Sequence, residues 1–201
     1  MKILIVLLFS TIFLGAAEPV LSKRGKLIFE DSFSKKLNSA WKFNKGKWQV
    51  KGGRLIGEEP QGNNHAVHLA YSPEIKGNLI IEFDMLIKSS NAQAGIMFNA
   101  GKGSPVKGHI GRATLKGKFF AIQRDKSKAV KKEKFKKAPV GKWFHLTFEL
   151  VGDTVVAQFN KKKLIIKHED FQRVNNMKML LLAGKTVEYK NFKMYKAIPN
   201  K

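Results

Sequence analysis

Cysteine is absent from the whole sequence of 201 residues. Disulfide bonds, thiolate metal sites and thiol nucleophiles are therefore excluded, and packing alone must stabilise the fold. Arginine is also rare, because the basic residues include only Arg24, Arg54, Arg112, Arg124 and Arg173 beside many lysines. No stretch shows a convincing 3.6-residue apolar period, and after the amino terminus none is long and apolar enough to span a membrane.

The net charge of +23 is therefore carried almost wholly by lysine. Arginine binds phosphate in a bidentate manner, whereas scattered lysines make a diffuse positive field. We therefore expect no nucleic-acid partner, and an anionic polysaccharide or a negatively charged cell surface fits the charge better. A basic proteome or simple solubility explains the same charge about as well.

The amino terminus has the pattern of a secretory signal. Lys2 precedes an apolar run from Ile3 to Leu14, and small residues follow as far as Ala17. A membrane anchor needs about 20 apolar residues, so this run predicts cleavage after Ala17 instead. We expect a signal peptide at 1–17, a short tail at 18–25 and a single domain at 26–198, exported to the periplasm or the extracellular space.

Alternation of apolar and polar residues marks two long strands. Residues 79–87 place Phe83 and its apolar partners on one face, and Glu82 and Asp84 on the other. Residues 144–150 alternate in the same way. Further strands are expected at 27–31, 48–51, 54–57, 66–71, 94–99, 109–116, 119–124, 155–159, 164–168, 178–183 and 188–195.

So many short strands without a helix exceed what one flat sheet tolerates. The sequence therefore predicts an all-β fold of two packed antiparallel sheets, of jelly-roll type. The lysine-rich stretch 126–137 is predicted to be a solvated loop, because a helix there would repel itself.

Several short motifs occur in order along the chain: Asp31-Ser32-Phe33, Trp41, Gly46-Lys47-Trp48-Gln49-Val50, Gly53-Arg54-Leu55, Ile81-Glu82-Phe83-Asp84, Gly141-Lys142-Trp143, Gly152-Asp153 and Asn191-Phe192. Together they resemble the 3-keto-disaccharide hydrolase-like domain family, of the concanavalin A-like lectin and glucanase superfamily. The resemblance covers nearly the whole mature chain. It implies an exported, carbohydrate-directed β-sandwich whose concave sheet is the expected ligand face.

Glu82 and Asp84 are the sharpest catalytic candidates, because two carboxylates two residues apart on a strand point to one face. Laminarinase-type glucanases of similar fold carry a further Glu there, and retaining chemistry needs carboxyl groups about 5 to 5.5 Å apart. Here the next residue on that face is Leu86, which argues against the glucanase mechanism. The alternative is a solvated strand face whose carboxylates pair with lysines.

His109 is the third catalytic candidate, and the substrate-binding candidates are Arg112, Gln123, Asp125, Asn99 and Tyr71. Planar polar side chains suit sugar hydroxyls, and Arg suits a carboxylated or sulfated sugar. His109 and Arg112 face opposite sides of one strand unless Gly111 forms a bulge. Without the bulge, His109 is an edge residue and Arg112 makes a structural ion pair.

Asp31 is a weak candidate for a structural calcium ion, beside Asn191 of the last strand, because calcium takes oxygen ligands. A simple hydrogen bond at the strand end is the alternative. His65 and His68 point apart on a strand, which argues against zinc. No other cofactor is expected.

Trp41, Trp48 and Trp143 suit either stacking on sugar rings or filling the space between sheets. Tryptophan at framework positions more often belongs to the core. We therefore expect at least two of the three to be buried.

The leading hypothesis is glycan binding on the concave sheet by one polar set, Glu82, Asp84, His109, Arg112 and Gln123. The rival is a hydrolase of 3-keto-disaccharides or related sugars, with Glu82 or Asp84 as base and His109 as acid, so catalysis stays open. A third hypothesis is a cationic envelope-surface protein that binds anionic polymers with strong salt dependence. The sequence specifies neither the glycan nor the oligomeric state.

Overall fold

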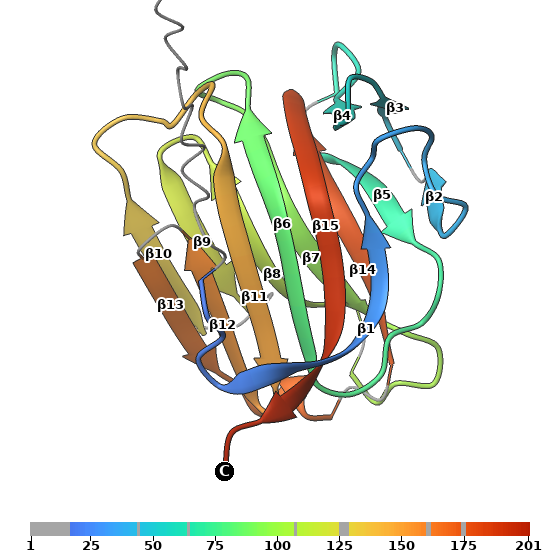
Figure 1. Cartoon of the computed structure of the whole chain (residues 1–201). Coiled ribbons are helices and arrows are strands. Elements are labelled where there is room, and N and C mark those ends of the chain that lie inside the picture. Colours follow the sequence, from blue (N-terminus) through green and yellow to red (C-terminus); the bar gives the residue numbers. More distant parts are fainter. Residues whose placement is uncertain are drawn as a thin grey trace, which may run out of the picture.

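Two antiparallel sheets packed face to face make up the computed structural model, which describes residues 17–43, 45–63, 65–106, 108–124, 129–159, 162–173 and 176–201 (Figure 1). The described residues form fifteen strands and one short 3-10 helix, Glu169–Phe171. The predicted all-β sandwich is confirmed. No helix formed by these residues is long and apolar enough to cross a membrane.

The eight-stranded sheet has the order β13-β12-β11-β6-β15-β4-β3, with β1 paired to β15. Its strands are β13 (Lys162–Lys167), β12 (Thr154–Phe159), β11 (Phe144–Val151), β6 (Leu79–Ile87), β15 (Thr186–Pro199), β4 (Leu55–Glu58), β3 (Lys47–Val50) and β1 (Ser22–Asp31).

The seven-stranded sheet has the order β10-β9-β8-β7-β14-β5-β2. Its strands are β10 (Val130–Lys134), β9 (Phe119–Gln123), β8 (His109–Lys116), β7 (Gln93–Ala100), β14 (Met177–Gly184), β5 (Val67–Tyr71) and β2 (Trp41–Phe43).

Strand β15 is a central strand of the larger sheet, because it pairs with β6 on one side and with both β4 and β1 on the other. Its pairing with β1 runs from Asp31 opposite Phe192 to Ser22 opposite Pro199. Beyond that end, Asn200 N–H donates to the carbonyl oxygen of Leu21. The first and last described segments therefore lie side by side.

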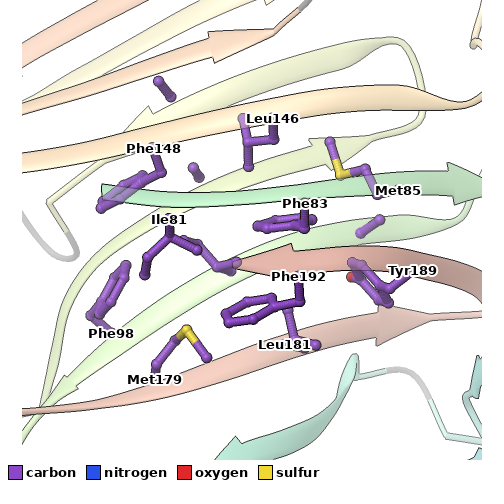
Figure 2. Close-up of a cluster of buried hydrophobic side chains, with 14 of the residues drawn as sticks. Ile81, Phe83, Met85, Phe98, Leu146, Phe148, Met179, Leu181, Tyr189 and Phe192 are labelled. Carbon is purple, nitrogen blue, oxygen red and sulfur yellow. The ribbon is translucent and has the colours of Figure 1, made fainter. Parts of the chain in front are cut away.

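The core lies between the sheets and is built from the inward half of each alternating strand. Figure 2 shows Ile81 and Phe83 of β6 facing Phe98 of β7 and Leu181 of β14. Phe120 of the smaller sheet likewise belongs to this buried cluster. Aliphatic and aromatic side chains thus fill the space without any cross-link, as the lack of cysteine requires.

Trp41 and Trp48 are 3% and 8% exposed, so the prediction that at least two tryptophans are buried is confirmed. Tyr71 is also buried, at 5% exposure, and its ring packs against Phe29 and Trp41. The prediction that Tyr71 binds substrate is therefore wrong. Its position in β5 points the ring into the core, because Leu69 and Tyr71 share the inward face.

One polar bridge joins the two sheets through the core. The hydroxyl of Tyr189, in β15, accepts a hydrogen bond of 2.9 Å from Gly95 N–H and donates to the carbonyl oxygen of Leu182. Burial raises the pKa of this hydroxyl, so it stays protonated. Gly95 has φ of +142°, and a Cβ there would lie 2.1 Å from the carbonyl oxygen of Ala113, so only glycine fits.

The expectation of a loop at 126–137 is wrong, because Val130–Lys134 forms β10 and pairs with β9. Residues 125–128 lie outside the described residues. Strand β10 is an edge strand with exposed lysines, which is a common way to protect a sheet edge from further pairing. Its sequence lacks apolar alternation for that reason, so the strand gives no amphipathic signal.

Tyr189→Phe should lower the free energy of unfolding by about 1–3 kcal/mol, because Gly95 N–H and the Leu182 carbonyl lose their partner inside the core. Denaturant unfolding measures the change. Tyr195→Phe, at a partly exposed position of the same strand, is the matched control and should change stability by less than about 0.5 kcal/mol. Equal losses in both variants would contradict a role for the bridge.

Candidate functional site

A groove of about 750 Å³ opens on the outer face of the seven-stranded sheet. It is lined by Ser90, Asn91, Gln93, Arg112, Thr114, Lys116, Gly117, Lys118, Phe119, Ala121, Gln123, Lys132 and Ala138. These residues come from strands β7 to β10, from the turn between β8 and β9, and from the segments just before β7 and just after β10. The groove therefore combines amide, hydroxyl, cationic and aromatic groups on one open surface.

Strand register explains why these side chains meet. Arg112 of β8 lies opposite Gln123 of β9, and Lys116 lies opposite Phe119. Residues paired across antiparallel strands share a face, and so do residues two apart on one strand. Alternate positions of β8 and β9 therefore all point outward, while the intervening Ala113 and Leu115 belong to the core.

The hollow follows from side-chain size at the middle of this register. Thr114 lies opposite both Ala121 and Gly95, and these three residues are short. The longer side chains of Arg112 and Lys116 rise on either side along β8. Short residues thus form the floor, and long residues form the walls.

Arg112 and Gln123 form the polar wall. With its amide oxygen toward the guanidinium, Gln123 accepts hydrogen bonds from Nε of Arg112 at 3.2 Å and from Nη2 at 2.7 Å. The two predicted substrate-binding residues therefore lie together in the groove. Their contact fixes the orientation of both planar groups.

His109 and Asn99 lie beyond the groove on the same outer face. Their side chains meet at 2.6 Å between Nδ1 and Oδ1. The pairing register shifts between Phe98 and Asn99, which gives β8 an extra residue beside Gly111. This bulge lets His109 and Arg112 share one face, as the sequence argument requires, although His109 is not among the residues that line the groove.

Glu82 and Asp84 do not join these residues, so the prediction of one five-residue polar set is wrong. Both carboxylates belong to β6 in the other sheet, where the intervening Phe83 faces the core. They therefore lie on the outer face of the eight-stranded sheet, across the sandwich from Arg112 and Gln123. Alternation correctly predicts that Glu82 and Asp84 share one face of their strand. It does not show that this strand belongs to the sheet without the groove.

Glu82 is buried, which contradicts the alternative of a solvated face at this position. Its Oε1 accepts hydrogen bonds from Nε of Arg24 at 2.9 Å and lies 2.7 Å from Nη2. Burial acts to lower the pKa of Arg24, but the hydrogen bonds and charges of Glu82 and Glu18 raise it overall. This carboxylate is held in a structural ion pair.

Asp84 is also held on both sides. Its Oδ1 lies 2.8 Å from Nδ1 of His145, and its Oδ2 accepts a hydrogen bond of 2.7 Å from the amide of Asn191. Sequence reasoning did not select His145, although it shares the outer face of β11 with Thr147 and Glu149 by simple alternation. Its pairing with Asp84 follows from the register of β11 against β6, which is not visible locally.

The amino-terminal segment 17–22 covers part of this face and runs in front of β12 and β11 in Figure 1. Val20 N–H and Leu21 N–H donate to the buried carboxylate of Glu149 at 2.5 and 2.9 Å, and the Ser22 hydroxyl donates to it at 2.9 Å. The amino-terminal segment of the chain therefore covers this part of the outer face of the eight-stranded sheet.

Asp125 and Asp31 are the two remaining predicted site residues. Asp125 lies outside the described residues. Asp31 accepts hydrogen bonds from Phe33 N–H and from the Trp41 indole at 2.8 and 3.0 Å, whereas Asn191 donates to Asp84. The described residues contain no cluster of three or more His, Asp and Glu side chains that could hold a metal ion.

No protein-family model and no curated protein matches the sequence. Solved structures do match. SCLam, a non-specific endo-β-1,3(4)-glucanase from family GH16, superposes with a TM-score of 0.66 at 10% identity, over 90% of this chain and 95% of that chain. The carbohydrate-binding module CBM66 from Bacillus subtilis gives a TM-score of 0.58 at 17% identity, over 78% and 96%.

A protein of unknown function with a galectin-like fold, also from Bacillus subtilis, gives a TM-score of 0.63 at 11% identity, over 90% of this chain and all of that chain, 100%. The chain has the concanavalin A-like lectin and glucanase fold. Identities this low show the fold alone. The similar structures include both a glucanase and a carbohydrate-binding module, so the fold by itself does not decide between catalysis and binding.

Glu149→Gln should lower the free energy of unfolding by about 1–3 kcal/mol, because an amide nitrogen cannot accept from the three donors of segment 17–22. Hydrogen exchange at Val20 and Leu21 should accelerate in parallel. Glu169→Gln, at an exposed position, is the control. Unchanged exchange at both amides would contradict the anchoring role of Glu149.

The imidazole of His68 should make the stability of the fold depend on pH. Burial, followed by the positive charges of His109 and Lys45, lowers the pKa of His68 below its ordinary value of 6.5. The folded chain therefore binds fewer protons here than the unfolded chain, and stability should fall as pH falls below about 6.5. His68→Gln should weaken this slope in denaturant unfolding at pH 8 and pH 5, whereas His65→Gln, in an exposed loop, should leave it unchanged.

Proposed function

We propose that this protein is an exported, non-catalytic carbohydrate-binding domain whose ligand lies in the groove of the seven-stranded sheet. The observation that carries the proposal is the composition of the groove. Its described lining contains amides, hydroxyls, cations and an exposed aromatic ring, but no carboxylate. Residues 125–128 lie outside that description.

The groove has the chemistry of a sugar site. Asn91, Gln93 and Gln123 each carry a donor and an acceptor, which suit the hydroxyl groups of a sugar ring. Phe119 is 41% exposed and offers an apolar face beside them. Ligand sites commonly combine an apolar surface with a few polar groups that fix orientation.

Hydrolysis finds less support. Most glycosidases place two carboxyl groups on either side of the scissile bond, about 5 to 9.5 Å apart. Glu82 and Asp84 lie on the other side of the sandwich, and their oxygens bind Arg24, His145 and Asn191. The motif resemblance to 3-keto-disaccharide hydrolase-like domains keeps such a reaction as the second candidate, with Asp84 and His145 as the pair that would have to act.

Export is part of the proposal because of the signal pattern before Ala17. Residues 18–21, just after that pattern, contact the sandwich: Gln158 donates to the Glu18 carbonyl, and Glu149 accepts from Val20 N–H and Leu21 N–H. Cleavage after Ala17 would therefore leave these contacts in the mature chain. The lack of cysteine fits either a periplasmic or an extracellular destination.

Phe119→Ala should weaken glycan binding roughly 2- to 10-fold, in line with about 0.5–1.5 kcal/mol for an aromatic contact. A glycan array followed by titration calorimetry on the best ligand measures the change. Phe43→Ala is the matched control, because Phe43 is 64% exposed on β2, away from the groove lining. Thermal melting verifies that both variants are folded.

Asp84→Asn should leave the affinity of the folded protein unchanged, because Asp84 lies on the opposite face. Mass spectrometry of the same glycans, together with 3-keto-disaccharides, tests for turnover against a heat-inactivated sample. Products that disappear in Asp84→Asn would overturn the binding proposal in favour of the hydrolase. Equal loss of binding in Phe119→Ala and Phe43→Ala would remove the groove as the site.

A further inference from the structure

We infer that the groove selects glycans that carry carboxylate or sulfate groups over neutral glycans. This inference rests on the proposed function and specifies its ligand class. The carrying observation is that four cations, Arg112, Lys116, Lys118 and Lys132, line one groove whose described lining contains no acid. A neutral sugar would offer no negative charge to the three lysines of this groove.

Among the residues that the structure describes, the groove lysines have no ion-pair partner. In the part of the chain that the structure describes, the ammonium groups of Lys116, Lys118 and Lys132 form no salt bridge, and all three residues are exposed. Each is therefore available to an outside anion at little desolvation cost.

Two buried acids of the larger sheet are already paired with cations. Glu82 binds Arg24, and Glu188 binds both Arg54 and Lys88. Burial acts to raise the pKa of Glu188, but Lys88 and Arg54 lower it overall. These two buried acids of the larger sheet are thus neutralised by cations, while the groove lining on the smaller sheet has cations and no acid.

The cations surround the floor instead of gathering at one point. Lys116 lies on β8 opposite Phe119, whereas Lys132 lies on β10 opposite Ala121. Strands β8 and β10 are two strand spacings apart, which is about 10 Å. A sugar ring over the floor would have cations on two sides, so charged substituents on successive sugars would each meet one.

The same surface suits nucleic acid less well. Strands of nucleic acid bind through several stacked bases and through arginine contacts to phosphate. The described groove lining offers one aromatic ring, Phe119, and one arginine, Arg112, which already bonds to Gln123. Its three amide side chains instead match the many hydroxyl groups of a glycan.

The test compares polygalacturonate, dextran sulfate, neutral dextran and single-stranded poly(dT) by titration calorimetry at two salt concentrations. The groove variant is Lys116→Gln with Lys118→Gln and Lys132→Gln. The control variant, with the same change in charge, is Lys35→Gln with Lys36→Gln and Lys163→Gln, all exposed residues outside the groove lining. Thermal melting checks that both fold.

We expect an anionic glycan to bind at least 10-fold more tightly than neutral dextran. The groove variant should lose about 10-fold in affinity, because three exposed charge pairs with the glycan are removed, and its salt dependence should become shallower. The control variant should change less than about 2-fold. This result would support the inference.

Three results would overturn it, and they are distinguishable. Equal affinity for neutral and anionic glycans would remove the ligand class while leaving the proposed function intact. Equal losses in the groove and control variants would show attraction to the whole cationic surface, with no selection by the groove. Poly(dT) as the tightest ligand, or no glycan binding at all, would overturn both the inference and the proposed function.

Discussion

The two-residue alternation of the β-strand is the constraint on which the whole molecule depends. Without disulfides, the sandwich depends on its central strands, each of which turns one set of side chains into a shared core. Phe83, Phe120 and Leu181 are held there by the same alternation that turns Glu82 and Arg112 outward. Pairing then decides which outward residues become neighbours.

The difference between alternation within a strand and pairing between strands explains how far the sequence could predict the structure. The strands Leu79–Ile87 and His109–Lys116 have the predicted boundaries, because alternation and turn residues are local signals. The strand order is not local. Glu82 and Arg112 both face outward as expected, yet they lie on opposite sides of the sandwich, since β6 and β8 belong to different sheets. The predicted five-residue polar set, which was chosen from outward-facing residues alone, therefore combined residues from two separate surfaces.

The candidate groove could be predicted only in part. Arg112 and Gln123 were selected from side-chain chemistry, and the structure brings them together. The hollow itself depends on Thr114 and Ala121, which are short residues with no signal of their own until pairing places them side by side. The covering of the opposite face by segment 17–22 could not be predicted from the sequence either. Glu149 bonds there to residues more than a hundred positions away in the chain.

The pairing of β1 with β15 has a mechanical consequence. Ser22 and Pro199 form the last pair of this ladder, and beyond it the segment before Ser22 crosses the outer face of the eight-stranded sheet to bond with Glu149. A pull applied at Ser22 and Pro199 would load the hydrogen bonds one pair at a time, from Ser22 toward Asp31, which is the geometry of unzipping. A load between the groove and one end would not concentrate on that first pair. The fold should therefore resist tension between the groove and one end of this ladder better than tension applied across the ladder's first pair.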